Sequence, residues 1–181
     1  MASEAPFSRK VRVDALPNEG LALTIEADAD ERAALAALCR LPAIAELAAR
    51  FLLKRAGSAG VRVTGNVHAE FTQTCVVSLE PFAATLDEPV EARFAPPAAK
   101  SAARRGATRR RAEIVALDGE DPPDPIVDGA IDLGALAAEF LALGLDPYPR
   151  KPGASFAPPD PEGGDASPFA ALSEWTEKSR E

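Results

Sequence analysis

Few side chains in this sequence have the chemistry that catalysis at neutral pH requires. The chain of 181 residues contains one histidine, His68, and two cysteines, Cys39 and Cys75. His68 lies on the polar phase of an alternating run, two residues before Glu70, which is the pattern of an exposed strand residue. Because no nucleophile shares a motif with this histidine, we expect a cross-strand surface residue rather than a general base.

Other routes to an enzyme or a metal centre are also weak. Ser78 and Ser101 lack the context of a catalytic serine, and the glycines of the chain form no phosphate-binding loop. Nothing in the sequence fixes the distance between Glu80 and Asp87, the nearest approach to a pair of carboxylates. One histidine and two cysteines cannot supply the four ligands of a structural zinc ion. We therefore predict no enzyme, no cofactor and no metal.

Cationic side chains cluster in one stretch of a chain whose net charge is −8. No acidic residue interrupts this basic segment, which consists of Lys100, Arg104, Arg105, Arg109, Arg110 and Arg111. A proline-bearing acidic stretch follows and contains Asp118, Glu120, Asp121, Asp124 and Asp128. Two interpretations remain open: a solvated loop in which opposite charges pair, and a site where the arginines contact nucleic-acid phosphates.

A second group of candidate binding residues lies after residue 144. Three prolines forbid helix there and hold the chain extended: Pro147, Pro149 and Pro152. Tyr148, Arg150 and Lys151 therefore stand on a stiff strip that suits docking. On a nucleic acid, the two cations would neutralise phosphates while Tyr148 stacks or packs.

An amphipathic helix is predicted to lead into this strip. Asp132 is a good N-cap, and Gly144 supplies a left-handed stop. Apolar residues recur between them at helical spacing: Leu133, Leu136, Phe140 and Leu143. Because an amphipathic face is usually buried in its own domain, we expect a core helix.

Alternating apolar and polar residues predict several strands in the first half of the chain. Residues 7–13 and 21–25 would pair as a first hairpin. Asp28 and Glu31 have the spacing of a capping box, which predicts a helix that ends before Pro42.

The alternation continues toward the middle of the chain. Residues 47–54 and 61–71 would form a second hairpin, although the alanines of residues 43–49 also permit helix. Residues 82–94 would add another strand. Shorter strand candidates are residues 114–117 and 126–131.

Clustered strands and separate helices indicate the α+β class. We expect a curved, mainly antiparallel sheet, partly barrel-like, covered by two or three short helices. Residues 1–156 would form a single domain, with the basic and acidic loop at about residues 96–125. Residues 157–181 would form a proline- and glycine-rich tail whose short amphipathic helix either packs back onto the domain or binds a partner. No window has the character of a membrane span or a secretory signal, so we expect a cytoplasmic protein.

Two segments carry a resemblance to a known family. The first reads Cys75-Val76-Val77-Ser78-Leu79-Glu80-Pro81. The second contains Asp124-Pro125-Ile126, Ile131-Asp132-Leu133-Gly134 and Asp146-Pro147-Tyr148-Pro149-Arg150-Lys151-Pro152-Gly153. Both resemble the YceD family, the large ribosomal RNA subunit accumulation proteins, in the form found in alphaproteobacteria. The ending Ser167-Pro168-Phe169-Ala170-Ala171-Leu172 is similar to one common in the family.

The chain also departs from the family pattern. Many members carry Cys-x-x-Cys-Leu-x-Pro in the first segment, and Ser78 stands in place of the second cysteine. Other branches have a cysteine-rich C-terminal segment that looks zinc-binding, whereas this C-terminus has neither cysteine nor histidine. We therefore expect Cys75 to be a buried strand residue rather than a metal ligand.

The resemblance implies a non-enzymatic factor for large ribosomal subunit biogenesis, required for 23S rRNA to accumulate. It would stabilise a precursor RNA or a ribosomal protein, and the expected contacts are Tyr148, Arg150, Lys151 and the arginines of the basic segment. The alternative is an acidic protein-interaction adaptor that never touches RNA and binds a basic partner such as a ribosomal protein. Neither reading involves a membrane or a small-molecule substrate.

Overall fold

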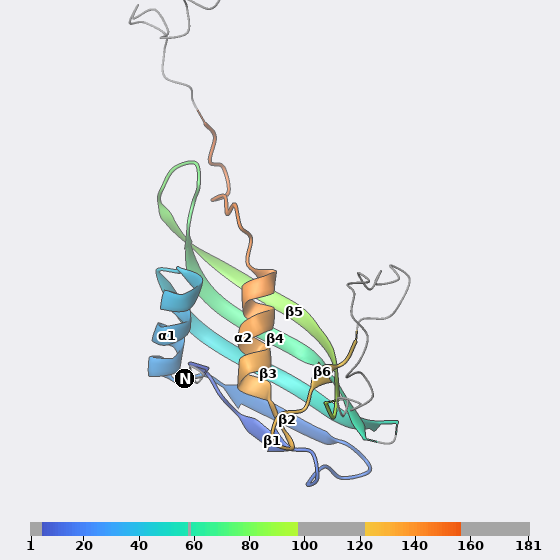
Figure 1. Ribbon diagram of the computed structural model, residues 1–181. Coiled ribbons are helices and arrows are strands. Elements are labelled where there is room, and N and C mark those ends of the chain that lie inside the picture. The colour runs from blue at the N-terminus through green and yellow to red at the C-terminus, as the bar shows by residue number, and fades with distance from the viewer. Residues whose placement is uncertain (1–4, 58, 98–121, 157–181) are drawn as a thin grey trace, which may run out of the picture.

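A computed structural model describes residues 5–57, 59–97 and 122–156, and the remaining residues lie outside this description. The described chain forms an open five-stranded sheet in the order β2-β3-β4-β5-β6, a two-stranded sheet of β1 and β7, and two helices (Figure 1). The strands are β1 (Lys10–Arg12), β2 (Leu21–Glu26), β3 (Ala43–Ala56), β4 (Gly60–Thr74), β5 (Pro81–Ala95), β6 (Asp124–Pro125) and β7 (Ala130–Asp132). The helices are α1 (Ala29–Cys39) and α2 (Leu133–Gly144).

The three long strands β3, β4 and β5 form the centre of the larger sheet and run antiparallel. On β4, Val61, Val63, Val67 and Ala69 are fully buried, while the residues between them are less buried or exposed. Both helices cover this apolar face of the sheet (Figure 1). The α+β class, the mainly antiparallel sheet, the β3–β4 hairpin and strand β5 are confirmed, whereas the sheet is not closed into a barrel.

The predicted first hairpin is wrong. Strand β1 pairs with β7, so that Val11 lies opposite Ile131, and β2 pairs with β3 along its whole length. The physical reason is burial: β7 carries Ile131, which is 2% exposed, and Phe7 ahead of β1 is fully buried. The start of the chain therefore closes the core beside α2 instead of extending the main sheet.

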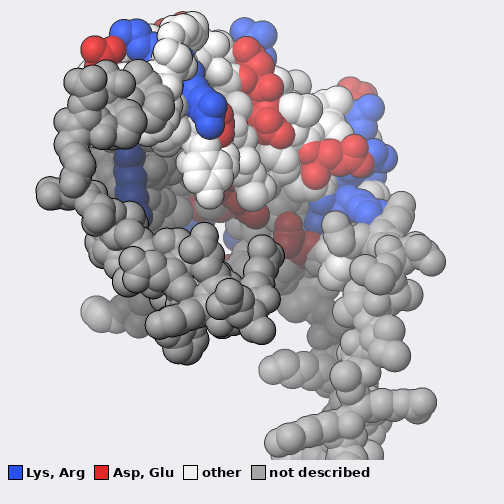
Figure 2. Space-filling model, turned by 90° about the horizontal axis from the view of Figure 1, so that it is seen from above, with Lys and Arg blue, Asp and Glu red and all other residues white. Residues whose placement is uncertain are grey.

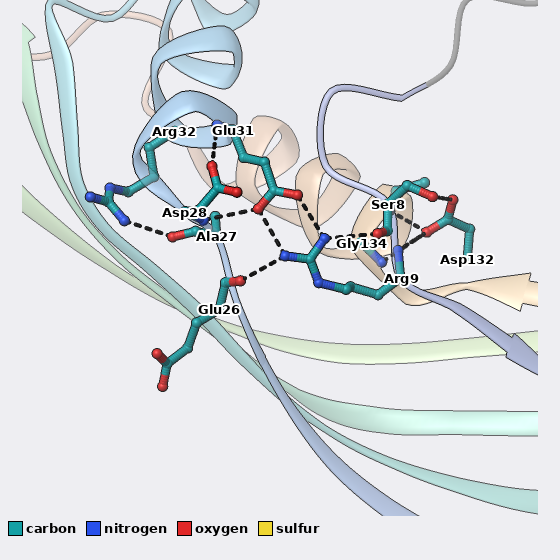
Figure 3. Close-up of polar contacts among 10 residues, drawn as sticks. Ser8, Arg9, Glu26, Ala27, Asp28, Glu31, Arg32, Asp132 and Gly134 are labelled. Atoms are coloured by element: carbon teal, nitrogen blue, oxygen red, sulfur yellow. Dashed lines mark hydrogen bonds and ion pairs between the residues drawn. The ribbon is translucent and has the colours of Figure 1, made fainter.

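Asp132 fastens the start of the chain to α2 (Figure 3). Its carboxylate accepts hydrogen bonds from the Ser8 hydroxyl at 2.6 Å and the Arg9 N–H at 2.8 Å. It also caps α2, accepting from the N–H groups of Gly134 at 3.1 Å and Ala135 at 3.2 Å. Burial alone would raise the pKa of Asp132, but the hydrogen bonds from Ser8, Arg9, Ala135 and Gly134 outweigh it and hold that pKa below its ordinary value.

Arg9 extends the same linkage to α1 (Figure 3). Its guanidinium donates to both carboxylate oxygens of Glu31, at 2.6 and 2.9 Å. Glu31 also accepts from the Asp28 N–H at 2.9 Å, and Asp28 accepts from the Glu31 N–H at 2.8 Å, which confirms the capping box. The hydrogen bond from Arg9 is the main reason that the pKa of Glu31 is lowered.

The buried face of α2 differs from the predicted stripe. Leu143 is 71% exposed, and Ala137 and Leu141 are buried instead. Gly144 has no left-handed backbone. It ends the helix against β5, where a Cβ atom at this position would lie 2.8 Å from Leu86 Cδ1. The helix therefore has its last turn close to β5, where Gly144 serves the close approach to Leu86 rather than a left-handed turn.

The remaining predicted elements have mixed outcomes. Residues 43–49 belong to β3 and are not helical. The single strand expected at residues 126–131 is wrong, because two short strands, β6 and β7, flank a turn that contains Asp128 and Gly129 at positive φ. Residues 114–117 and the predicted tail helix lie outside the described residues. No helix in the described part of the chain is long and apolar enough to cross a membrane.

Replacing Asp132 by alanine should lower the free energy of unfolding by about 2 to 3 kcal/mol. The change removes a helix cap, worth about 1 kcal/mol, and leaves the Ser8 hydroxyl and the Arg9 N–H without their acceptor. Urea unfolding at unchanged m value is the measurement. Glu139→Ala, on the exposed side of the same helix, should change stability by less than about 0.5 kcal/mol. Equal effects of the two substitutions would contradict the role given to Asp132.

Candidate functional site

The β4–β5 turn meets the strip that follows α2 (Figure 1). The Val76 N–H donates to the Pro149 carbonyl at 2.9 Å, and Lys151 Nζ lies 2.8 Å from Glu80 Oε2. These contacts join segments that are about seventy residues apart in the sequence, since Glu80 and Lys151 are separated by 71 positions. We call this place the junction: the turn of residues 75–80 together with the strip of residues 146–153.

The turn of the junction is closed by two backbone hydrogen bonds. The Cys75 N–H donates to the Glu80 carbonyl, and the Leu79 N–H donates to the Cys75 carbonyl, both at 2.9 Å. This geometry places Leu79 at φ +60°, a left-handed conformation that costs a branched L-residue roughly 1 kcal/mol or more. The Leu79 side chain is nonetheless 76% exposed. The side chain therefore buries little apolar surface to offset the strain in the Leu79 backbone.

Cys75 lies beneath this turn. Its side chain is fully covered but lies outside the hydrophobic core, and its Sγ accepts weak hydrogen bonds from the N–H groups of Val77 and Ser78, each at 3.4 Å. The Ser78 hydroxyl, followed by the N–H groups of Ser78, Lys151 and Val77, lowers the pKa of Cys75 to about 6. The predicted burial of Cys75 is confirmed. Its expected place in a strand is wrong, because β4 ends one residue earlier, at Thr74.

The strip presents two of its predicted contact residues to solvent. Tyr148 is 72% exposed, and its N–H is held by Asp146 Oδ1 at 2.8 Å, which fixes the bend of the chain there. Arg150 is also exposed. Lys151 has its charge matched by Glu80, whose carboxylate raises the pKa of the lysine.

The predicted contacts of the basic segment are not tested by the described part of the chain. Arg104, Arg105, Arg109, Arg110 and Arg111 lie outside the described residues, so their role stays a prediction. Seen from above, basic and acidic side chains are interspersed among uncharged ones rather than gathered in a patch of one sign (Figure 2). Charge alone therefore does not mark this part of the surface.

Sequence reasoning missed the apolar side of the junction. Val76 is 45% exposed and Leu79 is 76% exposed on the turn, and Tyr148 is exposed on the adjoining strip. The available signal was the occurrence of Val76, Val77 and Leu79 in a segment that has to turn before Pro81. An exposed apolar group with a charged rim is typical of a docking surface.

The side chains considered for catalysis lie apart from one another. His68 Nδ1 is 2.9 Å from Asp87 Oδ1 across β4 and β5, and that hydrogen bond is the main cause of the raised pKa of His68. Glu80 and Asp87 are seven residues apart along an extended chain, which is about 23 Å at 3.3 Å per residue. They cannot act as a carboxylate pair. Within the described residues, no group of three or more His, Cys, Asp or Glu side chains is placed to hold a metal ion.

A hollow of about 580 Å³ lies between α2, β6 and β7. Charged groups of both signs surround it, among them Lys10, Arg12, Asp124 and Glu139. Arg12 is paired with Asp14 at 2.7 Å, and Asp132 at the edge of the hollow is engaged as a helix cap. The hollow thus brings together no acid–base pair or nucleophile in the described chain.

Residues 63–175 match the family described as large ribosomal RNA subunit accumulation protein YceD. The match covers more than half of the chain and includes most of β4, all of β5 and α2, and both segments of the junction. The chain belongs to the YceD family. The family description implies a role in the accumulation of large-subunit ribosomal RNA. No curated protein and no solved structure gave a significant match.

Replacing Leu79 by glycine should raise the free energy of unfolding by about 0.5 to 1 kcal/mol, because glycine adopts φ +60° without strain. The gain is smaller than the strain itself, since glycine also increases the entropy of the unfolded chain. Urea denaturation measures the effect. Val127→Gly, at another exposed apolar loop position, is the control and should not stabilise. A destabilised Leu79→Gly variant would show that the exposed leucine supports the fold after all.

Thermal stability should rise between about pH 6 and pH 9 through Cys75. The folded-state pKa of the thiol, about 6, lies below its ordinary value of 9.0. Folding therefore favours the deprotonated form of Cys75. This stabilisation is complete above the unfolded pKa and is lost as the pH falls through 6. The difference in melting temperature between the wild type and Cys75→Ala, measured under reducing conditions, should grow across this range. A difference that is constant with pH would contradict the lowered pKa.

Proposed function

We propose that this protein is a non-enzymatic factor in large ribosomal subunit biogenesis. It supports 23S rRNA synthesis, processing or accumulation by binding a precursor RNA or a ribosomal protein. The family match supports the role, and the junction supports a binding mode for it. The single observation that supports the binding mode is the contact between the β4–β5 turn and the strip, because it joins two segments that each carry exposed side chains, Val76 and Leu79 on the turn and Tyr148 and Arg150 on the strip.

The chemistry of the junction favours binding over catalysis. Its apolar side chains can bury surface against a partner, Arg150 can pair with an anionic group, and the bond between Glu80 and Lys151 keeps the two segments together. Tyr148 can stack on a base or pack into a protein pocket. No group at the junction offers a general base beside a nucleophile, because the Cys75 thiol is covered.

The protein-adaptor alternative rests on two observations. The net charge of −8 suits a basic partner such as a ribosomal protein, and Val76 and Leu79 present apolar surface rather than phosphate-binding groups. The two modes differ in their response to salt and to charge reversal. Binding of RNA through the basic segment should weaken steeply with salt and collapse when Arg109, Arg110 and Arg111 become Glu. An acidic adaptor should tolerate that change and fail when Asp121, Asp124 and Asp128 become Lys.

Cells depleted of this protein should show a lowered ratio of large-subunit to small-subunit ribosomal RNA, with a matching loss of large-subunit particles in gradient profiles. Wild-type protein should restore the ratio, whereas the double variant Tyr148→Ala/Arg150→Glu should restore less than about half of it. Both side chains are exposed, so folding should be unaffected. Leu38→Ala, at an exposed apolar position on α1, is the matched control and should restore fully. An unchanged ratio after depletion would refute the proposed function.

A further inference from the structure

One face of the five-stranded sheet has no cover among the described residues. Helices α1 and α2 both pack on the opposite face (Figure 1). On the uncovered face, residues of β3 and β4 alternate with buried ones, and Arg50, Lys54, Arg62 and Asn66 are exposed there. An exposed surface with several polar side chains, which spans more than one strand, is thus available to a partner.

Cations line up across one end of this face. The strand register places Lys54 opposite Arg62, and Arg62 opposite Arg93, so the three side chains share one row on one face. Neighbouring strands are about 4.8 Å apart, which brings like charges close together at a cost to the sheet. Glu91 offsets part of that cost, because its carboxylate lies 2.5 Å from the Arg62 guanidinium.

Two cations of this face remain uncompensated within the described chain. Arg50 and Lys54 lie on the same strand and the same side, four residues apart, and no hydrogen bond or ion pair in the described part of the chain holds either side chain. Acidic side chains lie at the other end of the face. There Glu46 pairs across the strands with Glu70, and Asp87 is hydrogen-bonded to His68. The face is therefore polarised along the strands, with its basic end at the start of β4.

A shallow hollow of about 370 Å³ adjoins the basic end. Its lining includes Ala22, Thr24, Arg50, Leu52 and Thr64. Leu52 is 36% exposed and adds apolar surface to the lining, while the two threonine hydroxyls can donate and accept hydrogen bonds. The lining thus combines apolar surface with hydroxyl groups.

We propose that the basic end of the uncovered sheet face binds single-stranded RNA. Arg50, Lys54 and Arg62 contact successive phosphates, and the hollow beside Arg50 receives a base. This inference deepens the proposed function and rests on it, because it names RNA phosphate as the ligand and assigns it a surface separate from the junction. Because the net charge of the protein is −8, a polyanion is repelled by most of its surface and needs a local cluster of cations to bind.

The test compares two variants with the same change in net charge. Arg50→Glu/Lys54→Glu reverses the two uncompensated cations, and Lys10→Glu/Arg12→Glu reverses two exposed cations on β1, away from this face. A fluorescein-labelled 12-nucleotide single-stranded RNA is titrated with each full-length protein between 50 and 200 mM salt. Circular dichroism confirms that each variant is folded.

The sheet-face variant should bind the RNA at least about tenfold more weakly, and the slope of log affinity against log salt should fall in magnitude by about 1.4, since each phosphate contact to a single strand contributes about 0.7. The β1 variant should stay within about threefold of the wild type.

Wild-type affinity in the folded sheet-face variant overturns the inference, as does absence of salt-dependent binding by the wild type. Equal losses in both variants also overturn it, because they would reflect net charge alone. In each of these cases the ribosomal RNA ratio in depleted cells still decides the proposed function independently.

Discussion

The arrangement of this domain depends on the hydrogen bonds that the carboxylate of Asp132 accepts. This carboxylate joins the start of the chain to the first turn of α2 through the Ser8 hydroxyl and the Arg9 N–H, and Arg9 carries the connection on to Glu31 at the start of α1. Gly134 permits this contact, because a Cβ atom there would lie 2.7 Å from the Phe7 carbonyl oxygen. Since a helix is stiff, fixing the start of α2 also fixes where its far end delivers the strip to the β4–β5 turn.

Local signals in the sequence predicted the elements whose determinants are close together along the chain. Asp28 and Glu31 form the expected capping box, Asp132 caps the expected helix, and β3 pairs with β4 across a short turn. The pairing of β1 with β7 could not be predicted in this way. Its partners, Val11 and Ile131, are 120 residues apart, and the choice between β2 and β7 depends on which pairing buries the core.

The two proposed binding surfaces show the same division between local and distant determinants. Prolines predicted that Tyr148 and Arg150 would stand exposed on a stiff strip, and they do. That Lys151 is neutralised by Glu80 follows only from the meeting of the turn and the strip. The row of Lys54, Arg62 and Arg93 likewise depends on the register of β3, β4 and β5, which periodicity does not fix beyond the choice of face.

The long strands separate two surfaces of different chemistry. Arg62 lies near the start of β4 and Cys75 follows its end, so thirteen residues at 3.3 Å each place the basic row and the junction about 40 Å apart along the strand. That distance is several Debye lengths at physiological salt, so Glu80 in the junction does little to repel a phosphate at the basic row. An acidic protein can therefore contact RNA at one end of its sheet and a protein at the other. Because the two ends are far apart, RNA binding and protein binding are compatible parts of one function. Charge reversal at one end should leave the partner of the other end bound.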